Sequence, residues 1–312
     1  MAFSSSQPAM LFPGQGAQVP GMGVWLREHH TLAVELFDEA SDVLGYDLAE
    51  LCQQGPAETL NETIHSQPAL FVVGIAAARA YSEAFPSVQS RVVATAGLSL
   101  GEITAVCYAG GMQFADGVRL VQARGEAMQA CADAVDSGMA SVLGLDFESL
   151  QSVCDDALGA NEDGLVLMPA NLLCPGNIAV SGHAVMIERF QPLALEAGAM
   201  KVVPLSVAGA FHTSLMSQAV ERLRDALASI TMSDCRLPVF SNVDGKPHTS
   251  ADEIRDLLAR QVVNPVQWEA SIRAMIAAGV DGFIEAGTGR VLRGTIKRID
   301  RKMATQGFGD GS

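Results

Sequence analysis

Short apolar runs of strand length alternate with longer stretches of helical spacing along most of this chain, and this alternation limits the fold more than any other feature. The runs are AMLF, VVATAG, LPVFSNV and VDGFIEAG, which start at residues 9, 92, 237 and 280. Strands separated by helices favour a largely parallel sheet with helices packed on it. We therefore expect an α/β fold for most of the chain.

The middle of the chain follows a different order. Its segments predict strand, helix, strand, strand, helix and strand, in the sequence MASVLGL, FESLQSVCDDAL, GLVLMPANLL, NIAVSG, AVMIERFQPLALEAG and KVVPLSV. The order βαββαβ is that of a ferredoxin-like unit. We expect a small domain over 131–207, inserted into a large domain made of 1–130 and 208–312.

Composition excludes several classes of protein. The 312 residues are 49% hydrophobic and 18% charged, which is enough for a substantial core. A net charge of −15 argues against nucleic-acid binding. No apolar run approaches the roughly 20 residues that span a bilayer, and the start lacks the basic region of a signal peptide, so we expect a cytoplasmic protein without a membrane partner. The scattered cysteines predict reduced core residues rather than disulfides or a metal site: Cys52, Cys107, Cys131, Cys154, Cys174 and Cys235.

The run Gly97-Leu98-Ser99-Leu100-Gly101 fits the pattern G-x-S-x-G, with an expected strand before it and an expected helix after it. This is the nucleophile elbow, a sharp turn that exposes a serine hydroxyl and needs small residues on either side. The first amides of the following helix lack helical partners and are placed to stabilise an oxyanion. The alternative is a chance match in which small residues only make a tight turn.

A serine hydroxyl is a weak nucleophile at neutral pH, so it needs a base. Among the six histidines, His212 in VAGAFHTSLM follows an expected strand and precedes a helical run, whereas the other five lie in polar or loop-like stretches. A nucleophile followed about a hundred residues later by histidine matches the order of hydrolase-like dyads and triads. No acidic residue stands out as a third member. A lone loop histidine is more often inert than catalytic.

Another glycine-rich turn, MLFPGQGAQ, follows the first expected strand. Val19 stands where a dinucleotide-binding loop has its third glycine, so we predict no nucleotide cofactor here and none elsewhere. The turn offers a backbone amide to the same oxyanion as the elbow, which would complete a hole with two donors.

Arg124 lies on the expected helix FADGVRLVQARGEAMQACA, where its neighbours three and four residues away include Leu120, Ala127 and Met128. An arginine on an apolar stripe needs an anion, and its planar guanidinium suits a carboxylate. Arg119 has more polar neighbours and is expected in solvent. A structural ion pair with a distant acid is the alternative for Arg124.

Seven motifs occur together in this chain: FPGQGAQ, SQPALF, GLSLGE, QARGEAMQ, GAFHTSLM, NPVQW and EAGTGRVLRG. In their order and approximate spacing the chain resembles the malonyl-CoA:acyl carrier protein transacylases over nearly its whole length. The resemblance implies a hydrolase-like large domain with an inserted ferredoxin-like domain. It also implies a ping-pong reaction that moves malonyl from malonyl-CoA to serine and then to the phosphopantetheine thiol of acyl carrier protein, which supplies extender units for fatty-acid synthesis.

The resemblance also assigns roles to residues of the matching motifs. It makes Ser99 the nucleophile, His212 the base and Gln267 the residue whose main-chain carbonyl orients the histidine. It assigns the amides of Gln15 and Leu100 to the oxyanion hole. A carbonyl partner for the histidine would explain why no third acidic member stands out.

Substrate selection is assigned in the same way. The resemblance makes Arg124 the partner of the malonyl carboxylate and Gln67 a lining residue, and Phe211 matches the form found in malonyl-selective members. A ring at Phe211 would crowd a branched acyl group, but one methyl group is worth only about 1–3 kcal/mol, so this selectivity should be leaky. The chain departs from the family at Leu98, where histidine is usual, and at Leu173, where asparagine is usual. Both changes bear on rate and acyl preference.

Three alternatives stay open beside this reading: a free-standing acyltransferase of a polyketide pathway, a serine thioesterase or hydrolase that passes the acyl group to water, and a scaffold without activity. For the expected enzyme we predict acyl carrier protein and malonyl-CoA as partners and a monomeric state. The C-terminal run GRVLRGTIKRIDRKM holds six of the 20 basic residues. It predicts either a surface that attracts an acidic carrier protein or a solvated helix end.

Overall fold

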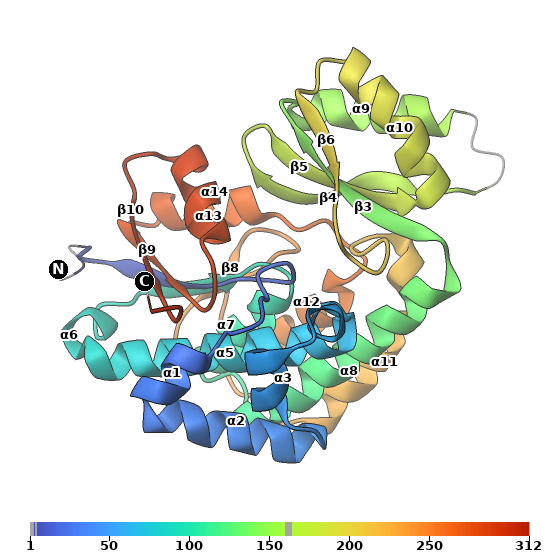
Figure 1. Ribbon diagram of the computed structural model, residues 1–312. Coiled ribbons are helices and arrows are strands. Elements are labelled where there is room, and N and C mark those ends of the chain that lie inside the picture. The colour runs from blue at the N-terminus through green and yellow to red at the C-terminus, as the bar shows by residue number, and fades with distance from the viewer. Residues whose placement is uncertain (1–2, 4, 160–163, 312) are drawn as a thin grey trace.

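The structure is a computed structural model that describes residues 3, 5–159 and 164–311. It contains a large part built on a six-stranded sheet and a smaller part built on a four-stranded sheet (Figure 1). The middle of the chain forms the smaller part, and the segments before and after it both belong to the large part.

The large sheet has the strand order β10-β9-β1-β2-β7-β8. All neighbouring strands in it are parallel except β7 and β8, so the expected mostly parallel α/β sheet is confirmed. The strands are β1 (Pro8–Phe12), β2 (Ala94–Gly97), β7 (Val239–Phe240), β8 (Pro247–His248), β9 (Gly282–Ala286) and β10 (Ala304–Phe308). Because β1 and β2 are parallel and in register, their carboxyl ends lie at the same edge of the sheet.

Helices cover both faces of this sheet. Alternate side chains of β1 point to opposite faces, so Met10 and Phe12 join one apolar cluster, whereas Ala9 and Leu11 join another with residues of α13 and α14. The helices of the large part are α1 (Val24–His29), α2 (Thr31–Leu44), α3 (Leu48–Gln54), α4 (Ala57–Asn61), α5 (Thr63–Ala84), α6 (Pro86–Gln89), α7 (Leu100–Tyr108), α8 (Phe114–Ala134), the 3₁₀ turn η1 (Ser214–Met216), α11 (Ser217–Ser229), α12 (Ala251–Gln261), α13 (Trp268–Ala277) and α14 (Val291–Ile299).

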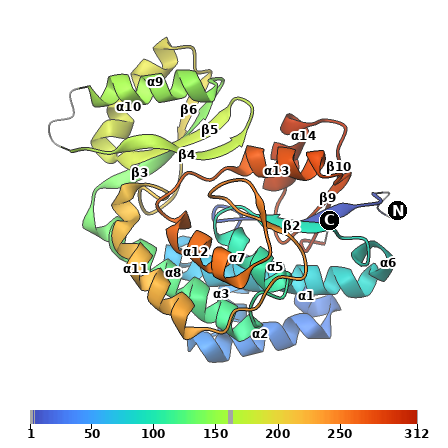
Figure 2. The same cartoon turned by 180° about the vertical axis from the view of Figure 1, so that it is seen from behind.

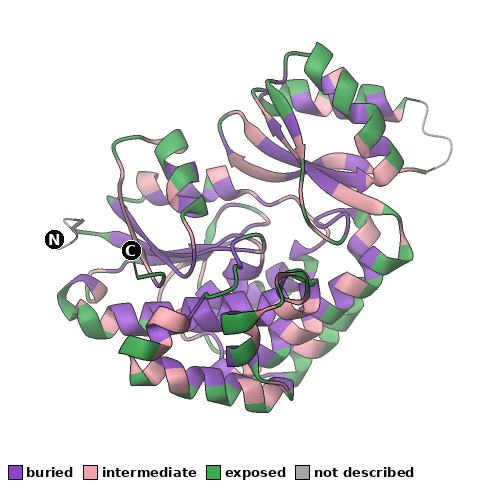
Figure 3. Ribbon diagram, in the orientation of Figure 1, coloured by how far each residue is buried: buried purple, intermediate pink, exposed green. Residues whose placement is uncertain are grey.

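Helix α5 is the centre of the large core. Every residue from Ser66 to Ala78 is buried, as expected for a helix that is apolar on all sides. Figure 3 shows the buried residues gathered in the sheet and in the helices beneath it. Helix α11 lies along α8 on the side seen in Figure 2. The large core therefore lies between the sheet and these helices.

The smaller part has the element order β3 (Ser137–Leu143), α9 (Phe147–Leu158), β4 (Leu167–Cys174), β5 (Asn177–His183), α10 (Ala184–Glu196) and β6 (Lys201–Pro204). Its strands pair in the order β4-β5-β3-β6, and all the pairs are antiparallel. Both helices pack on this sheet in a separate apolar core that includes Leu150, Val180 and Phe190. Helix α8 runs through residue 131 to Ala134, so the first residues of the expected domain 131–207 lie on a helix of the large part.

Two backbone hydrogen bonds join the small sheet to the segment that follows α12. Leu172 N donates to Val266 O at 2.9 Å, and Val266 N donates to Ala170 O at 2.7 Å. Arg298 on α14 also donates to Pro175 O at 3.1 Å. We call the two backbone bonds with Val266 the seam.

The expected core placement of the cysteines is confirmed, because all six are buried. Within the described ranges, no helix combines the length and the apolar character needed to span a bilayer.

Candidate active site

Ser99 stands on a sharp turn between β2 and α7. Its φ of 52° and ψ of −106° are rare for a residue with a side chain, and such strain is typical of functional sites. The turn requires glycine on both sides. A Cβ at Gly97 would lie 1.9 Å from the carbonyl carbon of Gly101, and a Cβ at Gly101 would lie 2.2 Å from Phe12 O. The local geometry is therefore that of the expected nucleophile elbow.

His212 faces the serine from the loop after β6. Its Nε2 lies 2.8 Å from Ser99 Oγ, and its Nδ1 lies 3.0 Å from the main-chain oxygen of Gln261. Since a carbonyl only accepts, the proton of the neutral ring belongs on Nδ1, which leaves Nε2 free to accept the serine proton. Burial, and then the charge of Arg124, lower the pKa of His212 to about 4. The imidazole is therefore neutral at neutral pH, as a general base must be.

The expectation that the carbonyl of Gln267 orients the histidine is wrong. That oxygen accepts from the amide and the hydroxyl of Ser271, at 2.9 and 3.0 Å, in the first turn of α13. The carbonyl that receives His212 Nδ1–H belongs to Gln261, the last residue of α12. A carbonyl at a helix end lacks an intrahelical partner. The carbonyl oxygen of Gln261 accepts a hydrogen bond from Asn264 N at 3.1 Å, and its second lone pair can accept the bond from the histidine.

Arg124 is buried, with 2% of its surface exposed, and its guanidinium reaches the nucleophile. Nη1 donates to Gln67 Oε1 at 2.8 Å, while Nη2 donates to Gln261 Oε1 at 2.8 Å and to Ser99 Oγ at 3.0 Å. Burial lowers the pKa of Arg124 to about 10, so the group stays charged at neutral pH. Among the described residues no carboxylate forms an ion pair with it. Its cation is available to an anionic substrate, whereas Arg119 is exposed as expected.

The two expected oxyanion donors belong to segments that pack against each other at the elbow. Leu100 is the first residue of α7, and the turn that carries Gln15 packs on the elbow so closely that a Cβ at Gly14 would lie 2.3 Å from Leu98 O. Within the part of the chain that the structure describes, neither the amide of Leu100 nor that of Gln15 donates a hydrogen bond. Both amides are thus available to a developing oxyanion.

Sequence reasoning missed a polar network beneath the elbow. Asn242 follows β7, the strand beside β2; its Oδ1 accepts from Ser99 N at 2.6 Å and its Nδ2 donates to Gly97 O at 2.7 Å. Glu102 Oε2 accepts from Gln261 Nε2 at 2.6 Å and from Asn242 N at 3.1 Å. The motif GLSLGE contained Glu102, but nothing in the local sequence indicated that this carboxyl is buried.

The residues expected to influence acyl preference are apolar side chains of two clusters. Phe211 is buried in the large core directly before His212. Leu98 belongs to the cluster that α13 and α14 form with the sheet, and Leu173 of the small sheet packs against that same cluster. The two positions that depart from the family pattern therefore contribute to one apolar surface.

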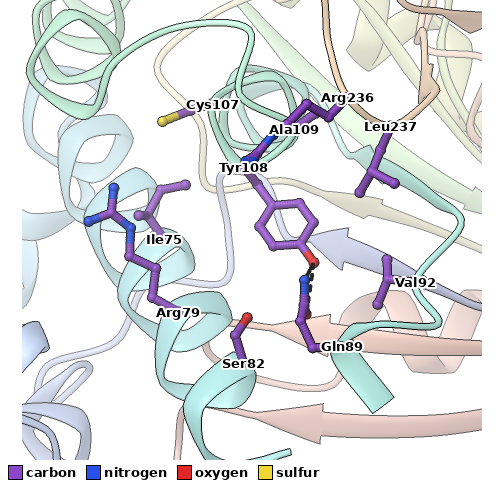
Figure 4. Close-up of a pocket in the computed structure, with 10 residues that line it drawn as sticks. All are labelled: Ile75, Arg79, Ser82, Gln89, Val92, Cys107, Tyr108, Ala109, Arg236 and Leu237. Carbon is purple, nitrogen blue, oxygen red and sulfur yellow. Dashed lines mark hydrogen bonds between the residues drawn. The ribbon is translucent and has the colours of Figure 1, made fainter. Parts of the chain in front are cut away.

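Two sizeable cavities lie away from the dyad. One, of about 680 Å³ between the small sheet and α13, includes Gln267 in its lining. Figure 4 shows the other, of about 390 Å³. Its lining residues Val92 and Leu237 precede β2 and β7, whereas Ser99 follows β2. Tyr108 and Gln89 are hydrogen-bonded to each other in it at 2.7 Å, and neither cavity contains the nucleophile or the base.

Comparison with known proteins agrees with this geometry. An acyl transferase domain model matches residues 9–306. The malonyl CoA-acyl carrier protein transacylase of Escherichia coli (strain K12) is 42% identical over 294 residues, which cover 94% of this chain and 93% of that protein. The malonyl CoA-acyl carrier protein transacylase of Bacillus subtilis (strain 168) is 41% identical over 305 residues, which cover 98% of this chain and 94% of that protein.

Solved structures match over the same extent. The malonyl CoA-acyl carrier protein transacylase of Coxiella burnetii has a TM-score of 0.92 at 34% identity and covers 98% of this chain and 96% of its own. A malonyl-transacylase solved in complex with its type II PKS acyl-carrier protein has a TM-score of 0.92 at 37% identity, with the same coverage of 98% and 96%. The chain thus belongs to the acyl transferase domain family, and within it to the malonyl CoA-acyl carrier protein transacylases.

Proposed function

We propose that this chain transfers malonyl from malonyl-CoA to the phosphopantetheine thiol of acyl carrier protein through an ester on Ser99. One observation carries the proposal: a base and a cation meet on the same oxygen. Ser99 Oγ lies 2.8 Å from His212 Nε2 and 3.0 Å from Arg124 Nη2. The base activates the oxygen, and the cation is placed to hold a substrate carboxylate beside it.

The first half-reaction makes the acyl-enzyme. His212 Nε2 takes the serine proton as Oγ attacks the thioester carbonyl, and the amides of Gln15 and Leu100 stabilise the oxyanion. The carbon–sulfur bond then breaks, and the imidazolium returns its proton to the departing thiolate of coenzyme A. Malonyl is left on Ser99 as an ester.

The second half-reaction reverses these roles with a different thiol. His212 takes the proton of the carrier thiol, and its sulfur attacks the ester carbonyl. The ester bond to Ser99 breaks and Oγ recovers a proton from the imidazolium. One base therefore serves both halves, and the enzyme returns to its starting protonation state.

Arg124 would select malonyl by exchanging protein partners for the substrate carboxylate. Its present acceptors are a serine hydroxyl and two glutamine oxygens, all neutral, so a carboxylate is the stronger partner. Gln67, fully buried, would keep the guanidinium in place during the exchange. Phe211 would disfavour a branched acyl group.

We also propose acyl carrier protein as the acceptor and fatty-acid synthesis as the pathway. The protein would be a cytoplasmic monomer whose small domain begins after α8, within the expected range 131–207. A related malonyl-transacylase was solved with its acyl-carrier protein, which supports the acceptor. Comparing kcat/KM for a fatty-acid carrier protein with that for a polyketide carrier protein tests the pathway.

Ser99→Ala tests the mechanism. Intact-protein mass spectrometry after mixing with malonyl-CoA should show a malonyl adduct on the wild type and none on the variant. His212→Ala should slow both half-reactions, by about 10²–10⁴-fold. An adduct on Ser99→Ala would place the nucleophile elsewhere, and rapid release of malonate from wild type without carrier protein would instead support a hydrolase.

A further inference from the structure

Glu102 is a buried carboxyl beneath the nucleophile that the mechanism above does not use. It lies in the first turn of α7, with 2% of its surface exposed. A buried carboxyl is costly unless hydrogen bonds and positive charge offset its desolvation. The groups that face it are Gln261 of α12, Ser241 and Asn242 after β7, and Arg124 of α8.

Both hydrogen-bond partners of Glu102 Oε2 lead directly to the catalytic pair. Gln261 donates its Nε2 to Glu102 at 2.6 Å and to Ser99 O at 3.0 Å, and its main-chain oxygen holds His212 Nδ1. Asn242 donates its backbone N–H to Glu102 at 3.1 Å, and its side chain holds the amide of Ser99 at 2.6 Å. One carboxyl oxygen thus joins the supports of the base and of the nucleophile.

The electrostatics of the site also require an anion here. His212 has a carbonyl, not a carboxylate, on Nδ1, and it becomes an imidazolium in each half-reaction close to the charged Arg124. Two buried cations repel each other in a medium of low dielectric. Glu102, one side chain away from both through Gln261, is the negative charge in this network. The amino end of α7 further favours an anion there.

We propose that Glu102 is a positioning residue for malonyl transfer: through Gln261 it fixes His212, through Asn242 it fixes Ser99, and its negative charge offsets the imidazolium formed in each half-reaction. This inference rests on the proposed serine mechanism. It supplies the acid that the dyad lacks, placed one residue further from the histidine than in a Ser-His-Asp triad.

Glu102→Gln tests the proposal because it keeps the shape and an acceptor oxygen but removes the charge. We expect kcat to fall about 10- to 100-fold, the usual effect of removing a group that orients a functional side chain. KM for malonyl-CoA should not rise, since Glu102 lies behind the site and Arg124 and Gln67 remain in place. A purely structural role would instead loosen the site and raise KM as kcat falls.

The pH profile gives a second readout. Burial raises the pKa of Glu102 to about 7, although hydrogen bonds and Arg124 lower it in part. If its ionised form is needed, wild-type kcat falls as the pH drops through about 7, while His212, with its pKa of about 4, still stays neutral. Glu102→Gln should lack this acid limb. A limb near pH 7 that persists in the variant overturns the proposal.

Glu285→Gln is the matched control. Glu285 of β9 is also a buried carboxyl of the large part, with 1% exposed, and it accepts hydrogen bonds from the amides of Leu292 and Arg293 at the start of α14. Its loss should lower the melting temperature but leave kcat and the pH profile unchanged. If Glu102→Gln does not fold, Asn242→Ala tests the link to the nucleophile, because it keeps the backbone N–H that binds Glu102 and removes the side chain that binds the amide of Ser99. Its kcat should fall at least tenfold with unchanged KM, and a kcat within twofold of wild type overturns the proposal.

The outcomes separate this inference from the proposed function. In the proposal, Glu102→Gln still forms the full malonyl adduct on Ser99 when given time, only more slowly. Wild-type enzyme without an adduct would contradict the serine mechanism whatever Glu102 does. A folded Glu102→Gln variant with wild-type kcat would contradict only the role of Glu102.

Discussion

Replacing Arg124 by alanine should lower malonyl transfer more than acetyl transfer. The guanidinium is buried, charged and bonded only to neutral oxygens, so a malonyl carboxylate would be its direct anionic partner. In Arg124→Ala that carboxylate would be buried without a partner. Breaking a buried ion pair from one side costs about 3–5 kcal/mol, which corresponds to a roughly 150- to 5,000-fold loss in kcat/KM for malonyl-CoA.

Acetyl-CoA provides the comparison because it has no carboxylate. The bonds to Gln67 and Gln261 are lost with either thioester. With acetyl-CoA no ion pair is lost, and the bond lost at the reacting oxygen is the one from Nη2 to Ser99 Oγ; a single hydrogen bond to a charged group contributes about 1.5–3 kcal/mol. Taking about 4 kcal/mol for the lost ion pair and about 2 kcal/mol for the lost hydrogen bond, the ratio of malonyl to acetyl transfer should fall roughly 30-fold. Competition between the two thioesters, read as acyl-enzyme masses, measures this ratio directly.

Two further variants control the experiment. Arg124→Lys keeps the charge but loses the planar fork, so it should retain part of the malonyl preference. Arg119→Ala, on the same helix but exposed and paired with Asp116, should behave as wild type. If malonyl and acetyl transfer fall by the same factor in Arg124→Ala, the arginine supports the fold and does not bind the substrate.

Two other outcomes follow from the geometry. Gly97→Ala should destabilise the protein by at least about 1–3 kcal/mol, because the new Cβ would lie 1.9 Å from the backbone of the next glycine of the elbow; a urea midpoint equal to that of wild type would contradict the close packing. Neutralising exposed basic residues near the C-terminus should raise KM for acyl carrier protein at low salt and leave acylation by malonyl-CoA unchanged; a KM insensitive to these changes would exclude this surface from docking. The residues for this variant are Arg290, Arg301 and Lys302.

Local features of the site were predictable because short stretches of sequence encode them. The elbow needs only a strand, five residues with glycine at both ends and a helix, and the structure places Ser99 on such a turn. The helix expected over 147–158 begins and ends at those residues, with Asp146 as its cap. In both cases neighbours in the sequence decide the geometry.

The features that the sequence did not predict depend on contacts between distant segments. Gln261 and Gln267 lie six residues apart in the same run. The histidine ring bonds to the carbonyl of Gln261 because the end of α12 lies beside the loop that carries His212. A glutamate in the first turn of a helix is usually exposed, so the burial of Glu102 had no local sign. One of the six basic residues of the C-terminal run is also not free for a partner, because Arg293 pairs with the buried Glu285.

The seam has a consequence for solubility. Strand β4 lies at an edge of the small sheet, and an edge presents unpaired amides and carbonyls on which another chain can add as a strand. The bonds that Leu172 N and Ala170 O make with Val266 occupy part of that edge from within the same molecule. The contact that ties the small sheet to the segment after α12 therefore also keeps copies of this chain from pairing strand to strand along β4.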